Sequence, residues 1–170
     1  AMAEVALERG YDVLILTNAM RPMMRPVVQE GLLRLSSEWP GKLTLRISVD
    51  HYDMDLHDAE RGAGAFDKTL KGMHRLRDNN IRMAVAGRSV MAHSEAESRA
   101  GYAAFFAEHR FDIDADDPGM TVLFPEMDTS VEVPEITTAC WGILGKSPDA
   151  MMCASSRMVV KRKGAAKPAV

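Results

Sequence analysis

The chain has 170 residues and a mass of 18.7 kDa, enough for one domain with a packed core but not for two full ones. A hydrophobic fraction of 46% and a charged fraction of 26% exclude a disordered or collagen-like chain. The net charge of -3 is spread along the chain without a basic stripe, so we do not expect nucleic acid as a partner. No apolar run approaches the roughly 20 residues of a membrane span, so we do not expect a membrane as a partner either. Two cysteines and the lack of a secretory leader predict a cytoplasmic protein with reduced thiols.

Hydrophobic periodicity predicts strands and helices that alternate along the chain. Residues 43–49 alternate apolar and polar side chains, which is typical of a strand with one mixed face, and the run 13–16 is continuously apolar, as in a buried strand. Gly10 ends a helix before that run, and Ser94 with Glu97 has the capping-box pattern that begins another. The expected strands are 13–16, 43–49, 81–86 and 120–124. The expected helices are 1–9, 27–37, 66–78 and 94–109.

The connections from strand through helix to strand predict a parallel sheet, because such crossovers are almost always right-handed and bring consecutive strands into the same direction. The expected fold class is therefore α/β. Parallel α/β folds bind ligands at the carboxyl ends of their strands, which here are the loops after residues 17, 49, 87 and 124. From residue 131 onward Pro and Gly break the pattern, so residues 131–170 are expected to form an extension with a last strand-like run at 157–161.

The densest polar segment follows the second expected strand, where imidazole and carboxylate side chains crowd a single loop. They are His51, Asp53, Asp55, His57, Asp58 and Glu60. These groups suit zinc, iron or manganese, so one hypothesis is a metal-dependent hydrolase. It would use His51, Asp53, His57 and Asp58. Ligands that lie along one loop converge poorly on an ion, so a solvated loop that faces a substrate is the other interpretation.

The two cysteines, Cys140 and Cys153, lie in the expected extension. Two thiols alone do not complete a four-ligand metal site. Free buried thiols and partial ligation of a cluster therefore both stay open.

Three segments, taken in order, resemble the radical S-adenosylmethionine (radical SAM) enzymes. They are 14–18 (Leu-Ile-Leu-Thr-Asn), 45–52 (Leu-Arg-Ile-Ser-Val-Asp-His-Tyr) and 57–66 (His-Asp-Ala-Glu-Arg-Gly-Ala-Gly-Ala-Phe), with Leu70 and Gly72 after them. In that family the third strand of a partial (βα)6 barrel often ends in Thr-Asn and the fourth in a Ser-x-Asp sequence. The resemblance implies that 1–130 form approximately strands three to six of such a barrel. It also implies that 131–170 begin a truncated auxiliary-cluster extension of the SPASM or twitch type.

The resemblance assigns roles to particular residues. Ser48 and Asp50 would hydrogen-bond the ribose of S-adenosylmethionine. Asn18 would lie at the neighbouring strand end, and Arg88 would pair bidentately with the carboxylate of the ligand. An auxiliary cluster would use Cys140 and Cys153.

The Cys-x-x-x-Cys-x-x-Cys motif that binds the [4Fe-4S] cluster of the family does not occur in these 170 residues. We therefore expect a fragment of a longer enzyme, inactive without that motif. The parent would generate a deoxyadenosyl radical for hydrogen abstraction from a small-molecule or peptide substrate, with flavodoxin or ferredoxin as electron donor. The alternatives are the metal-dependent hydrolase and a non-catalytic α/β binding module.

Overall fold

The computed structural model describes residues 2–126 without a break and, after them, short stretches of the chain. These are residues 130, 132, 135, 137–143, 145, 147–150, 160 and 162–167. The chain divides into two compact units, Ala1–Met127 and Asp128–Val170. The strand-like run expected at 157–161 lies outside the described residues, apart from Val160.

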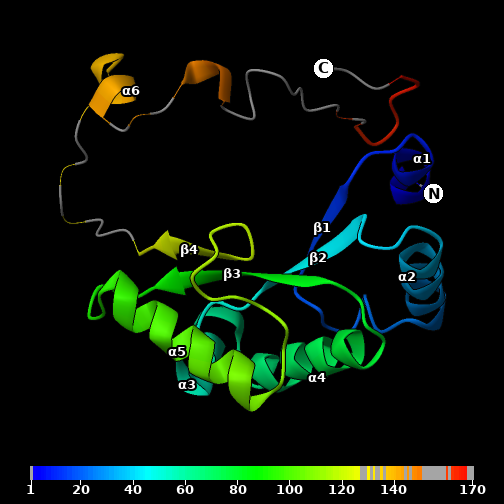
Figure 1. Ribbon diagram of the computed structural model, residues 1–170, viewed down its shortest axis with the longest axis horizontal. Coiled ribbons are helices and arrows are strands. Elements are labelled where there is room, and N and C mark those ends of the chain that lie inside the picture. The colour runs from blue at the N-terminus through cyan, green and yellow to red at the C-terminus, as the bar shows by residue number, and fades with distance from the viewer. Residues whose placement is uncertain are drawn as a thin grey trace. The chain divides into compact units, whose positions relative to one another are not determined.

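Four strands of the first unit form one parallel sheet (Figure 1). They are β1 (Val13–Thr17), β2 (Leu43–Ser48), β3 (Met83–Ser89) and β4 (Thr121–Pro125). Their order in the sheet, β1-β2-β3-β4, is their order in the chain, and at least one helix lies between each strand and the next. The predicted α/β fold with a parallel sheet is therefore confirmed.

Helices of the first unit connect the strands, and α3, α4 and α5 lie on one side of the sheet (Figure 1). The helices of this unit are α1 (Met2–Glu8), α2 (Pro26–Glu38), α3 (Met54–Arg61), α4 (Ala65–Asp78) and α5 (Glu95–Glu108). In the second unit the structure describes α6 (Ala139–Ile143) and a 3-10 turn, Pro148–Ala150. Ser94 caps α5 through the predicted capping box with Glu97. Of the helices that the structure describes, none has the length and apolar character to cross a membrane.

The two faces of the sheet differ in exposure. Leu45 and Ile47 of β2 are 1% and 0% exposed and pack in the core beneath the helices. On the opposite face Leu14, Leu16 and Phe124 are 47%, 70% and 57% exposed. The prediction that β1 is fully buried is thus wrong for one face, because the described helices α3, α4 and α5 pack on the other side (Figure 1).

The polar segment after β2 is helical rather than the loop that we expected. Asp53 caps the N-terminus of α3, and its Oδ1 accepts a hydrogen bond from the Leu56 amide at 3.1 Å. Gly62, with φ of 95°, ends the helix. Within α3 only His57 is buried, so the helix lacks the apolar stripe that periodicity detects.

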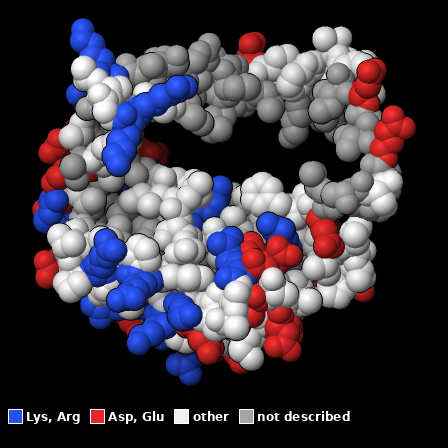
Figure 2. Space-filling model, turned by 180° about the vertical axis from the view of Figure 1, so that it is seen from behind, with Lys and Arg blue, Asp and Glu red and all other residues white. Residues whose placement is uncertain are grey.

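Charged side chains are unevenly distributed over the surface. In the view of Figure 2, Lys and Arg gather at the lower left, whereas Asp and Glu are more frequent at the lower right. Helix α4 exposes Lys68, Lys71 and Arg75, while its other face, with Met73 and Leu76, packs in the core. This is the arrangement expected of an amphipathic helix that covers a sheet.

Candidate functional site

The carboxyl ends of β2, β3 and β4 surround a cavity of about 680 Å³. Its lining residues are Ser48, Asp50, Arg61, Ala86, Gly87, Arg88, Phe124, Pro125 and Glu126. A volume of this size lies within the range of small-molecule sites. The cavity also lies where parallel α/β sheets bind their ligands, so it is the candidate site of this protein.

The structure brings three of the four predicted ligand-binding residues together. Ser48, Asp50 and Arg88 line the same cavity. Asn18 does not line it: its Oδ1 accepts a hydrogen bond from the Met20 amide at 3.1 Å, and its backbone oxygen accepts one from Thr69 at 3.1 Å. The structure therefore gives Asn18 the contacts of a turn residue at the end of β1.

The carboxylate of Asp50 is engaged by arginine side chains. Arg61 Nε donates to Asp50 Oδ2, and Arg61 Nη2 donates to Oδ1 at 3.1 Å, which makes a bidentate pair. The Nε atom of Arg88 lies 3.7 Å from Asp50 Oδ1. With only 9% of its side chain exposed, Asp50 acts in this structure mainly as an anchor for the two guanidinium groups.

The backbone of Asp50 is held from both sides. Its amide donates a hydrogen bond to His57 Nδ1 at 3.2 Å. Its carbonyl oxygen accepts from the Arg88 amide at 3.0 Å and lies 3.0 Å from Tyr102 Oη, which lies 2.8 Å from the oxygen of Val49. These contacts fix the direction in which the chain leaves β2, and with it the position of the Asp50 side chain.

The protonation states of the two supporting rings fit these hydrogen bonds. Burial raises the pKa of Tyr102 far above the usual range, so the hydroxyl keeps the proton that it donates. Burial also lowers the pKa of His57, which favours the neutral imidazole that an acceptor at Nδ1 requires.

Two glycines make room for these contacts. A Cβ atom on Gly87 would lie 2.2 Å from Tyr102 Oη, so a larger residue in β3 would displace the tyrosine. A Cβ atom on Gly101 would lie 2.2 Å from the Tyr52 ring, which packs edge-on against Tyr102 with the ring centroids 5.3 Å apart. The close approach of β3, α5 and the strand end therefore depends on both glycines.

Two polar side chains leave room for a ligand at this site. Ser48 is partly exposed, and among the described residues its hydroxyl has no hydrogen-bond partner. Arg88 is half exposed, and its Nη1 lies 3.1 Å from Glu60 Oε2 at the end of α3. The site thus offers a hydroxyl and an accessible guanidinium beside the apolar ring of Phe124.

The metal-binding hypothesis does not fit the geometry. His51 Nδ1 accepts the Asp53 amide at 2.9 Å, and Asp53 in turn caps α3. The carboxylate of Asp58 accepts the amides of Gly64 and Phe66, and these hydrogen bonds lower its pKa. Among the described residues no group of three or more His, Cys, Asp or Glu side chains is placed to hold an ion.

The auxiliary cluster at Cys140 and Cys153 stays a prediction, because the structure describes one of these two cysteines. Cys140 of α6 is a free, partly buried thiol, and a cluster needs several thiolates. Cys153 lies outside the described residues.

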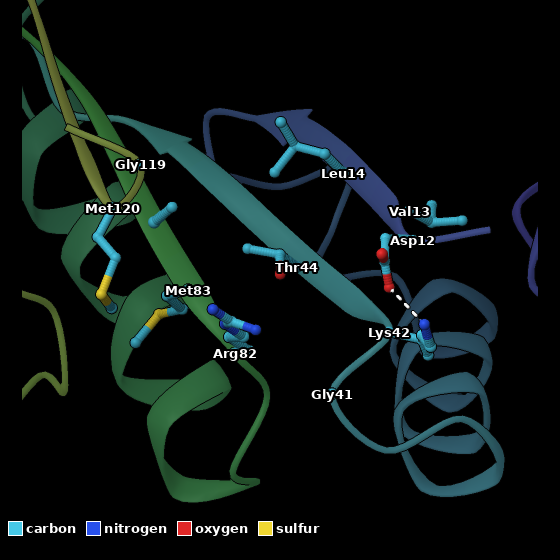
Figure 3. Close-up of a pocket in the computed structure, with 11 residues that line it drawn as sticks. Asp12, Val13, Leu14, Gly41, Lys42, Thr44, Arg82, Met83, Gly119 and Met120 are labelled. Atoms are coloured by element: carbon cyan, nitrogen blue, oxygen red, sulfur yellow. Dashed lines mark ion pairs between the residues drawn. The ribbon is translucent and has the colours of Figure 1, made fainter. Parts of the chain in front are cut away.

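A second hollow lies at the opposite, amino-terminal edge of the sheet (Figure 3). It has a volume of about 280 Å³, and Asp12 and Lys42 point toward each other across one end of it, 3.0 Å apart. Arg82 lies farther along the same edge. Because ligands of parallel sheets bind at the carboxyl ends of the strands, this smaller hollow is not our candidate.

Sequence reasoning did not identify Arg61 or Tyr102 as site residues. The spacing of four between His57 and Arg61 places both on one face of a helix, a signal that is readable only once α3 is known to be helical. Tyr102 is 52 positions from Asp50 in the chain and carries no local signal of the contact.

Comparisons with known proteins show one distant neighbour. No protein-family model matches the chain, and no curated protein matches it. The crystal structure of SuiB from Streptococcus suis bound to S-adenosylmethionine is similar to 76% of this chain, with a TM-score of 0.49 and 14% sequence identity. The similarity covers 26% of that chain, so this protein spans about a quarter of its length.

Proposed function

We propose that the carboxyl end of this sheet binds S-adenosylmethionine, as part of a barrel of the radical SAM type. The observation that carries the proposal is the shared cavity of Ser48 and Arg88 beside Phe124. A serine hydroxyl hydrogen-bonds ribose oxygens, a guanidinium binds the carboxylate of the methionine part, and an aromatic ring packs against adenine. Asp50 supports the site by orienting Arg88 and by fixing the strand end.

The topology supports the barrel part of the proposal. The strands follow one another in chain order with no reversal, as in a barrel and unlike a doubly wound sheet. On the open face, Ala84 and Ala86 of β3 lie next to Arg46 and Ser48 of β2, so small side chains alternate with a single long one. Parallel sheets are normally covered on both faces, so an open face of this kind suits the interior of a barrel.

The proposal is limited to binding. Because a [4Fe-4S] cluster needs several thiolates and the structure describes one cysteine, Cys140, we derive no radical step from the described residues. Cleavage of S-adenosylmethionine, the substrate, the electron donor and the auxiliary cluster stay expectations of the resemblance.

Calorimetric titration of the purified protein with S-adenosylmethionine tests the proposal. We expect one site per chain, and the substitution Ser48→Ala should weaken binding by about twofold to tenfold, since it removes one hydrogen bond. Thr44→Ala is the matched control, because Thr44 lies on the same face of β2 but lines the hollow at the amino end. No binding by the unmodified protein, or equal losses in both variants, would contradict the proposal.

Metal analysis of the same preparation tests the alternative. Stoichiometric zinc or manganese that His57→Asn releases would favour the hydrolase, despite the diverging contacts of its four candidate ligands.

A further inference from the structure

The guanidinium of Arg88 faces two acidic side chains through different nitrogen atoms. Its Nη1 lies 3.1 Å from Glu60 Oε2, and its Nε lies 3.7 Å from Asp50 Oδ1. A carboxylate binds bidentately along one edge of a guanidinium, either through Nε and one Nη or through both Nη atoms. Each edge of Arg88 therefore has one nitrogen that already faces an acid.

The two acids differ in how firmly they are held. Asp50 is 9% exposed and also makes the bidentate pair with Arg61, so it stays in place when Arg88 changes partner. Glu60 is 48% exposed and lies in the last turn of α3, outside the lining of the cavity. An ion pair between exposed side chains contributes little, and a ligand can displace it.

We infer that Glu60 competes with the carboxylate of the ligand for Arg88, so that the Glu60–Arg88 ion pair lowers the affinity of the site for carboxylate ligands. The inference rests on the proposed binding of S-adenosylmethionine. Displacement of Glu60 frees the edge formed by Nη1 and Nη2, and this edge then takes the ligand. Glu60 is in this way a specificity-determining residue that never contacts the ligand.

The substitution Glu60→Gln removes the charge and keeps the shape of the side chain. We expect it to tighten the binding of S-adenosylmethionine by about twofold to fivefold in calorimetry at fixed salt, because the released ion pair is an exposed one. Glu95→Gln is the matched control: Glu95 pairs with Arg99 at 2.8 Å on α5 and is also exposed. It should leave the affinity unchanged.

Two further titrations separate competition from a general charge effect. Decarboxylated S-adenosylmethionine has no carboxylate, so Glu60→Gln should not tighten its binding. In a protein that already carries Arg88→Ala, Glu60→Gln should have no effect on S-adenosylmethionine, because the contested partner is gone. Equal tightening for both ligands would overturn the inference.

The outcomes also distinguish the inference from the proposed function. One outcome is that S-adenosylmethionine binds and Ser48→Ala weakens that binding, while Glu60→Gln leaves the affinity for the ligand unchanged or lowers it. In that case the inferred competition is wrong and the proposed function stands. If the ligand binds neither the unmodified protein nor the Glu60→Gln variant, both proposals fail.

Discussion

The imidazole of His57 is fully buried and accepts the hydrogen bond of the Asp50 amide through Nδ1. Protonation would turn this acceptor into a donor and remove the hydrogen bond. Burial lowers the pKa of His57 in the folded protein, whereas the unfolded chain has the ordinary value of about 6.5. As pH falls below that value, the unfolded chain takes up a proton that the folded protein does not. The free energy of unfolding should therefore decrease as the pH decreases below about 6.5.

One proton taken up only by the unfolded chain changes the free energy of unfolding by about 1.4 kcal/mol per pH unit. Urea denaturation followed by circular dichroism at about pH 5.5 and about pH 7.5 measures this slope. His51 and His74, whose pKa values burial also lowers, contribute to the same range, so the comparison must be made with a variant. The variant is His57→Asn, whose amide oxygen keeps an acceptor near the place of Nδ1 and does not titrate.

We expect His57→Asn to show a smaller loss of stability on acidification than the unmodified protein, by up to about 1.4 kcal/mol per pH unit. His57→Leu should have the same reduced slope but a lower stability at neutral pH, by about 1–3 kcal/mol, because the Asp50 amide is left buried without an acceptor. Equal slopes in the unmodified protein and in His57→Asn would refute the assignment of a neutral, accepting imidazole.

Three further predictions concern the elements that hold the site. Gly87→Ala should destabilise the protein by about 1–3 kcal/mol, because its Cβ would overlap Tyr102 Oη. The control Gly31→Ala has open space around it in α2 and should stabilise the protein by about 0.5–1 kcal/mol. Equal effects of the two substitutions in urea denaturation would contradict this prediction. Tyr102→Phe should cost about 1–3 kcal/mol, because the Val49 oxygen loses its phenol partner, and an unchanged urea midpoint would argue against that hydrogen bond. Ser94→Ala should lower the free energy of unfolding by about 1 kcal/mol, because it removes the N-terminal cap of α5. Amide hydrogen exchange should then increase first in the initial turn of α5, and a uniform increase across the protein would contradict the capping role.

Local sequence signals predicted most elements of the sheet and its helices. The alternation in 43–49 gave β2, and Ser94 with Glu97 marked the start of α5. These signals act over a few residues, through side-chain periodicity and hydrogen bonds to nearby amides. Helix α3 was missed for the same reason: its buried side chain is a histidine, and Met54 and Leu56 are exposed, so no apolar period is present.

The sequence by itself determined that polar groups follow the second strand, whereas the ligand-binding roles of Ser48, Asp50 and Arg88 came from the family resemblance. Only the tertiary structure decided that these three residues line one cavity and that Asn18 lies outside it. It also decided that the carboxylate of Asp50 is already paired with Arg61. The physical reason is the register of the parallel strands. Ser48 pairs with Ala86, which brings residues that are far apart in the chain to the same edge of the sheet. No short-range pattern encodes that register.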